Sequence, residues 1–136
     1  MRNLRWAIIL AAAAYALPAA AADPYLFDVI KKPAYARALT SLLQGAPGLP
    51  SWTRKLLSPR GDYVGSPVAY VTVAGTRYEL FNACKAHDCD SSRVEVMFSP
   101  NGAQAWAGVY EAGRPITWLG APTPAQQQAM TGALQP

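Results

Sequence analysis

Histidine and cysteine are scarce in this chain of 136 residues, which holds one histidine and two cysteines. Enzymes with a cysteine nucleophile pair it with a histidine that is distant in sequence, and no second histidine is available here. The haem-attachment pattern C-x-x-C-H is absent, and so is any cluster of Lys and Arg interleaved with aromatic residues, which would indicate nucleic acid as a partner. These gaps argue against an enzyme, and we expect no cofactor.

Long apolar runs are also scarce, and the main one lies near the N-terminus. Trp6 to Leu17 follows a basic start and precedes small residues that end at Ala22. This order predicts a secretory signal peptide over residues 1–22 and a mature domain over residues 23–136. The run is shorter than the roughly 20 residues that a membrane span needs, although an uncleaved anchor is the alternative. We expect a periplasmic protein with no membrane contact after cleavage.

Two segments carry helix signals. Residues 33–44 begin with a proline, which suits the first helical position, and end before Gly45, a residue typical of helix ends. Between them runs an apolar stripe at helical spacing, formed by Tyr35, Ala38, Leu39, Leu42 and Leu43. Near the C-terminus, the pattern Thr123-Pro124-Ala125-Gln126 predicts the start of a second helix with a capping box.

The region from residue 68 to residue 119 is rich in β-branched and aromatic residues and is divided by turn signals. Ala74-Gly75 predicts a two-residue hairpin turn, and the other connections are short, which favours an antiparallel meander. The predicted strands are residues 68–73, 76–81, 93–98, 104–110 and 116–119. The fold class is therefore predicted to be α+β, a five-stranded antiparallel sheet with flanking helices.

Both cysteines and the histidine lie between the second and third predicted strands, in Cys84-Lys85-Ala86-His87-Asp88-Cys89. In an exported protein we expect Cys84 and Cys89 to be joined. A ring of this size adds only about 2 kcal/mol to stability, but it fixes the shape of the loop before a partner arrives and so lowers the ordering cost of binding. We predict a rigid loop that protrudes from the sheet.

His87 can donate hydrogen bonds from both ring nitrogens when it is protonated. An imidazole could thus bond the two carboxyl groups that flank the scissile bond in a glycosidase site. Lys85 adds a positive group, and Asp88 either assists or holds the turn through backbone N–H groups. Two other interpretations stay open: a metal site of Cys84, His87 and Cys89, which would need a fourth ligand, and a structural disulfide with an incidental histidine.

The six-residue segment and its surroundings resemble the Ivy family, the periplasmic inhibitors of vertebrate lysozyme. The family's loop reads C-K-P-H-D-C, and this chain has Ala86 in place of the proline. The resemblance extends through Leu49-Pro50-Ser51-Trp52, Thr76–Phe81 and residues 92–98. It implies a sheet flanked by helices, with a disulfide-closed loop whose histidine enters the lysozyme cleft and bonds the catalytic carboxylates.

The resemblance favours a non-enzymatic lysozyme inhibitor with residues 84–89 as its inhibitory loop and a c-type lysozyme as its target. Two alternatives remain: a regulator of the bacterium's own lytic transglycosylases, as some family members are thought to be, and an envelope scaffold whose loop binds without blocking catalysis. A homodimer is also left open. Because proline fixes φ, Ala86 is expected to leave the loop looser than that of the family.

Overall fold

The computed structural model describes residues 15, 17 and 22–134. The predicted signal peptide, residues 1–22, lies almost wholly outside the described residues. The helices are α1 (Leu26–Val29), α2 (Pro33–Gln44) and α3 (Pro124–Leu134), with the 3-10 helices η1 (Ser51–Leu57) and η2 (Pro100–Gly102). The strands are β1 (Val64–Gly65), β2 (Ala69–Val73), β3 (Thr76–Cys84), β4 (Ser92–Phe98), β5 (Ala105–Glu111) and β6 (Thr117–Leu119).

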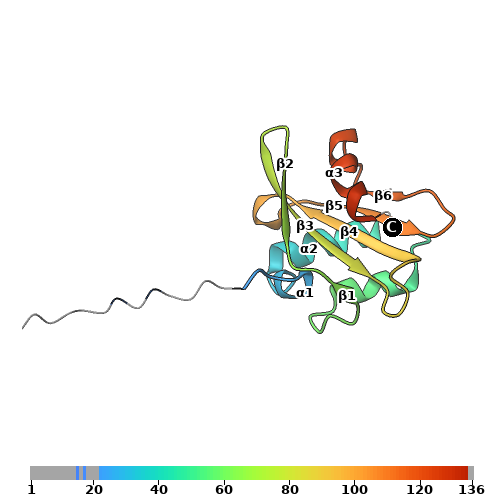
Figure 1. Ribbon diagram of the computed structural model, residues 1–136, viewed down its shortest axis with the longest axis horizontal. Coiled ribbons are helices and arrows are strands. Elements are labelled where there is room, and N and C mark those ends of the chain that lie inside the picture. Colours follow the sequence, from blue (N-terminus) through green and yellow to red (C-terminus); the bar gives the residue numbers. More distant parts are fainter. Residues whose placement is uncertain (1–14, 16, 18–21, 135–136) are drawn as a thin grey trace, which may run out of the picture.

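The strands form one antiparallel sheet in which β2 to β6 follow each other as a meander (Figure 1). The α+β prediction and all five predicted strands are confirmed. A sixth strand, β1, was not predicted: it pairs Val64 with Cys84 and Gly65 with Ala83, beside the end of β3 that β2 leaves uncovered. Two residues within a segment rich in Gly and Pro are too short to show a periodic pattern.

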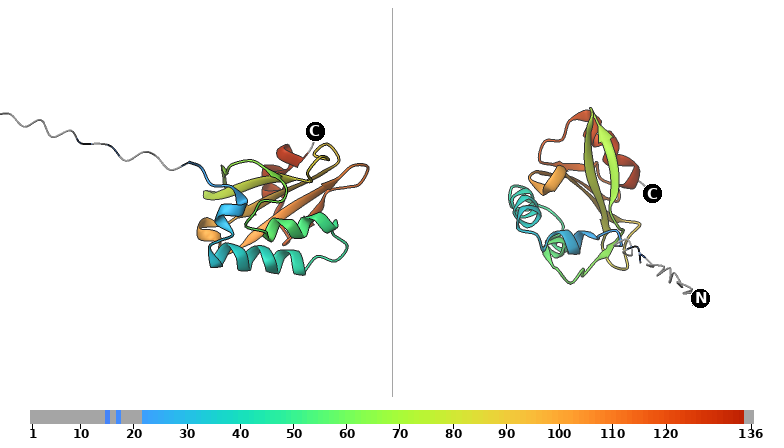
Figure 2. Two further views of the ribbon diagram at one scale, coloured as in Figure 1. Left: turned by 90° about the horizontal axis from the view of Figure 1, so that it is seen from below. Right: turned by 90° about the vertical axis from the view of Figure 1, so that its left-hand side faces the viewer.

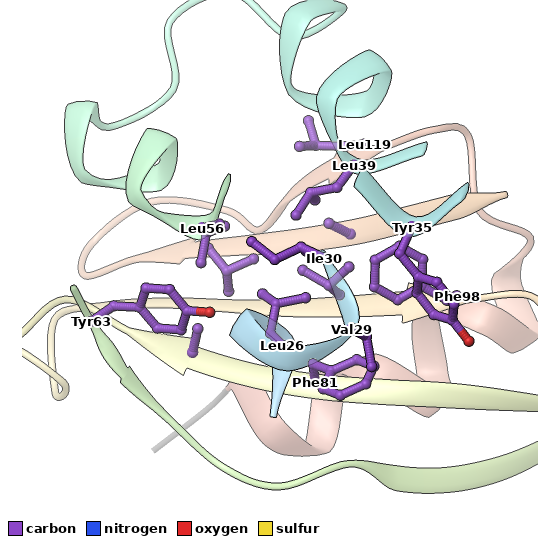
Figure 3. Close-up of a cluster of buried hydrophobic side chains, with 14 of the residues drawn as sticks. Leu26, Val29, Ile30, Tyr35, Leu39, Leu56, Tyr63, Phe81, Phe98 and Leu119 are labelled. Carbon is purple, nitrogen blue, oxygen red and sulfur yellow. The ribbon is translucent and has the colours of Figure 1, made fainter. Parts of the chain in front are cut away.

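Helices cover both faces of the sheet, with α1, α2 and η1 on one side and α3 on the other (Figure 2). Helix α2 has the predicted bounds and buries Tyr35 and Leu39. The main core lies between these N-terminal helices and the sheet, where Phe81 and Phe98 are fully buried (Figure 3). The ring of Tyr35 meets Phe98 edge-on, with the ring centroids 4.9 Å apart.

A second, smaller core lies under α3, where Met130 packs against Leu80 and Met97. The predicted capping box starts this helix: the Thr123 N–H donates to Gln126 Oε1 (2.8 Å) and the Gln126 N–H donates to Thr123 Oγ1 (3.2 Å). Because α3 covers this face, the sheet has no solvated side along β4, and even Glu95 is only 3% exposed.

Candidate functional site

The segment that holds the histidine connects two strands inside the sheet, not at its edge. Cys84 is the last residue of β3, and β4 begins at Ser92, so the loop extends from the end of a paired ladder (Figure 1). The disulfide between Cys84 and Cys89 is present, with the two Cα atoms 4.9 Å apart. Cys84 is 6% exposed, so one end of the ring is fixed in the protein and the other end carries the exposed residues.

The tip of the ring is a tight turn. The Asp88 N–H donates to the Lys85 carbonyl at 3.0 Å, and His87 has a φ of 66°. A positive φ at the third position of such a turn, after a residue with negative φ, is the mark of a type II turn. His87 therefore occupies the left-handed region, which is uncommon for residues other than glycine but which His adopts more often than most, as Asn and Asp do, and the turn presents it as an exposed residue.

Ala86 occupies the second position of this turn, where proline is common because its fixed φ matches the geometry. The N–H of Ala86 donates no backbone hydrogen bond within the described part of the chain. A proline at this position would therefore remove no bond. The geometry of the turn is thus compatible with a proline at residue 86.

The two charged residues of the loop pair with each other. Lys85 Nζ lies 3.9 Å from Asp88 Oδ2, with side chains 52% and 43% exposed. Such a pair contributes little to stability. The expected alternative role of Asp88, in which its carboxylate accepts from backbone N–H groups, is not what the structure shows: its backbone carbonyl does so, accepting from Ser91 (3.2 Å) and Ser92 (3.1 Å).

Three residues that sequence reasoning did not identify as functional lie at the base of the loop. Trp52 Nε1 donates to Ser92 Oγ at 2.7 Å, and the Ser92 hydroxyl donates to Glu111 Oε1. Trp52 and Ser92 are 6% and 2% exposed. The one available signal in the sequence was Trp52 itself, because a buried tryptophan needs a hydrogen-bond partner for its N–H. The sequence could not identify that partner, which is 40 residues away.

The loop is a projection, and two hollows of the surface lie away from its tip. One, of about 650 Å³, lies between α2 and β5 and contains no loop residue. A hollow of about 490 Å³ between residues 47–50 and 111–117 is lined by Glu111. A convex, covalently closed tip is suited to enter the cleft of another molecule.

The metal-site interpretation of Cys84, His87 and Cys89, which was left open, requires a free thiolate, and so does the cysteine nucleophile that the sequence already disfavoured. Both sulfurs of the loop are bonded to each other, so neither can serve. No group of three or more His, Cys, Asp or Glu side chains is placed to hold a metal within the described residues. In the same part of the chain, no helix is long and apolar enough to cross a membrane.

Comparison with known proteins places the chain in a family. Residues 34–136 match the family described as Inhibitor of vertebrate lysozyme (Ivy). A protein of Pseudomonas aeruginosa named Inhibitor of vertebrate lysozyme is 30% identical over 77% of this chain and 65% of its own length. A protein of the same name from Escherichia coli K12 is 37% identical over 49% of this chain and 38% of its own length.

An uncharacterised protein of Pseudomonas aeruginosa is 29% identical over 99% of this chain and 94% of its own length. The two named relatives are matched over less than two thirds of their lengths. The family match, in contrast, runs from the start of α2 to the end of the chain and includes the whole loop and sheet. The chain belongs to the Ivy family of inhibitors of vertebrate lysozyme.

Proposed function

We propose that this protein inhibits lysozyme by inserting the loop of residues 84–89 into the active-site cleft, with His87 facing the catalytic carboxyl groups. Family membership carries the proposal. The geometry of the loop supports it, because His87 stands at the exposed end of a ring closed by a disulfide. A loop with a fixed shape loses little freedom when it binds.

The chemistry of the target fits the same placement. A lysozyme site holds two carboxyl groups on either side of the scissile bond, and a protonated imidazole can donate one hydrogen bond to each. Lys85 and Asp88 are proposed to assist at the rim. Since they already form a pair within the loop, their contribution is expected mainly in the association rate and its dependence on salt.

The proposed site of action is the periplasm, reached through a signal peptide over residues 1–22. N-terminal sequencing of protein recovered from the periplasm tests this step. A mature chain that begins near Asp23 supports export with cleavage, and a chain that keeps Met1 contradicts it.

The inhibition test is clearance of a bacterial cell-wall suspension by a c-type lysozyme with increasing amounts of this protein. Loss of clearance at equimolar protein supports the proposal. Binding in calorimetry without loss of clearance would instead indicate a scaffold. Release of soluble product from peptidoglycan by a purified lytic transglycosylase, measured in parallel, decides whether that enzyme is the better target.

The role of His87 needs a variant that keeps the turn. Alanine would add backbone strain at a φ of 66°, whereas asparagine tolerates this region. His87→Asn therefore removes the imidazole and keeps the backbone. A central anchor costs about 2–4 kcal/mol on truncation, which is about 30- to 1000-fold in affinity. Equal inhibition by His87→Asn and wild type would exclude His87 from the mechanism.

A further inference from the structure

Ser92 connects both ends of the loop to the rest of the protein. Its backbone carbonyl accepts from the Lys85 N–H at 3.1 Å, and its backbone N–H donates to the Asp88 carbonyl at 3.1 Å. These bonds reach the first and last residues of the turn that presents His87. Any shift of Ser92 is therefore passed to the turn from both sides.

The side chain of Ser92 is in turn held by two elements outside the loop. The indole of Trp52, in η1, can only donate a hydrogen bond. In the bond of 2.7 Å between Trp52 Nε1 and Ser92 Oγ, the Ser92 hydroxyl oxygen is therefore the acceptor. The hydroxyl proton is then left for Glu111, at the end of β5. The result is a directed chain of hydrogen bonds from η1 through β4 to β5, with Ser92 only 2% exposed.

Backbone hydrogen bonds hold the same part of β4 as these side-chain hydrogen bonds do. Ser92 stands opposite Glu111 in the β4–β5 ladder, and the Ala112 N–H donates to the Ser91 carbonyl at 2.8 Å. Arg93 adds a contact from the other face of β4, because its Nε donates to the Cys89 carbonyl. The segment that leads out of the ring is thus bonded to its neighbours at consecutive residues.

We propose that Trp52, Ser92 and Glu111 form a brace that sets the position of the His87 turn, with Glu111 as its positioning residue. The part of this proposal that concerns inhibition rests on the proposed function. The brace does not touch the target: it acts through Ser92 on the turn between Lys85 and Asp88. A binding tip needs supporting residues of this kind, since a small displacement of the contact group weakens binding.

The test compares two carboxylates with similar local chemistry. Glu79 accepts a hydrogen bond from the Tyr35 hydroxyl at 2.7 Å, but it lies on β3 opposite Phe98, at the far end of the ladder from the loop. Glu79→Ala is therefore the matched control for Glu111→Ala. Glu111→Gln keeps an oxygen that can accept from Ser92 and serves as the conservative variant.

The readout that needs no target is amide hydrogen exchange at residues 85–92. Loss of one hydrogen bond at the base is expected to speed exchange of the Asp88 and Ser92 amides by about 3- to 10-fold in Glu111→Ala. Glu79→Ala should leave these amides unchanged, and Glu111→Gln should stay within about twofold of wild type. If Glu111→Ala changes exchange in the loop no more than Glu79→Ala does, the brace is refuted.

The second readout is inhibition of a c-type lysozyme by the same variants. Glu111→Ala is expected to weaken inhibition by about 3- to 10-fold, mainly through faster dissociation, with Glu111→Gln close to wild type. Faster exchange together with unchanged inhibition refutes the positioning role. A wild type that inhibits no lysozyme overturns the proposed function, and the exchange data then decide the brace alone.

Discussion

Glu95 provides a direct link between a buried group and the stability of the fold. Its side chain is 3% exposed beneath α3, and Asn82 Nδ2 donates to its Oε2 at 3.0 Å. Burial raises the pKa of Glu95 from 4.5 to about 7, against the smaller lowering effect of the Asn82 bond. Helix α3 contains no charged residue, so it offers the carboxylate no charged partner.

The sign of the pH effect follows from the proton count. Between pH 4.5 and about 7 the folded protein keeps the Glu95 proton, whereas the unfolded chain releases it. The free energy of unfolding should therefore fall as pH rises through this window and level off above it. A shift from 4.5 to about 7 corresponds to about 3 kcal/mol.

Glu95→Gln removes the ionisation and keeps the shape. The oxygen of the new amide can still accept the Asn82 bond, while its N–H₂ group needs an acceptor, which costs about 1 kcal/mol if none is found. At pH 5 the variant should be about as stable as wild type or slightly less stable. At pH 8 it should be more stable, by about 2–3 kcal/mol.

Urea unfolding of both proteins at pH 5, 6, 7 and 8 measures the difference, in which the contributions of the other carboxylates cancel. Asp62→Asn, which neutralises an exposed carboxylate, is the control for loss of one negative charge. A difference between Glu95→Gln and wild type that stays constant from pH 5 to pH 8 would show that Glu95 ionises as readily in the folded protein as in the unfolded chain.

Three further predictions concern the loop and the core. Ala86→Pro should tighten binding to a lysozyme by about 0.4–1 kcal/mol, up to about fivefold, because the turn already suits proline; weaker binding in calorimetry would mean that residue 86 needs another geometry. Replacing Cys84 and Cys89 by serine should lower the free energy of unfolding by about 2 kcal/mol, leave the far-UV circular dichroism of the sheet intact and weaken inhibition. Gly102→Ala should lower the free energy of unfolding, measured in urea, by about 2 kcal/mol or more, because the added Cβ would lie 2.5 Å from the Tyr35 ring. Gly75→Ala, also at positive φ but with open space around it, should lower the free energy of unfolding by less.

Patterns local in sequence predicted the elements well. Helix α2 has its predicted bounds because its proline start and apolar stripe agree with each other. The Ala74-Gly75 turn formed as predicted, with φ values of 49° and 82°. Val94 and Glu95 are neighbours in β4 and therefore face opposite sides of the sheet, but this alternation could not show that a second layer buries Glu95 as well as Val94. Only the docking of α3 decides that.

The disulfide of the candidate site was predictable from the sequence, whereas the contacts that hold the base of the loop were not. The spacing of Cys84 and Cys89, with the predicted export signal, was enough to predict the disulfide ring, which the structure contains. The left-handed backbone of His87 was not predictable from the sequence, because His adopts a positive φ more often than most residues but still only in a minority of cases. The contacts of Ser92 with Trp52 and Glu111 span 40 and 19 residues, and no local pattern reports contacts at such separations.

The position of the loop between two paired strands limits which part of its backbone can change conformation. Strand β4 is paired with β3 on one side and with β5 on the other along its length, and helices cover both of its faces. The start of the ring is fixed at Cys84 in β3, and its end is bonded at Ser92. Between these fixed points lies the turn from Lys85 to Asp88, whose two end residues are bonded to Ser92 and are joined to each other by one backbone hydrogen bond and an exposed ion pair. Ala86 lies inside this turn, and its N–H donates no backbone hydrogen bond in the described part of the chain. Binding data for Ala86→Pro will therefore report on the turn and not on its base.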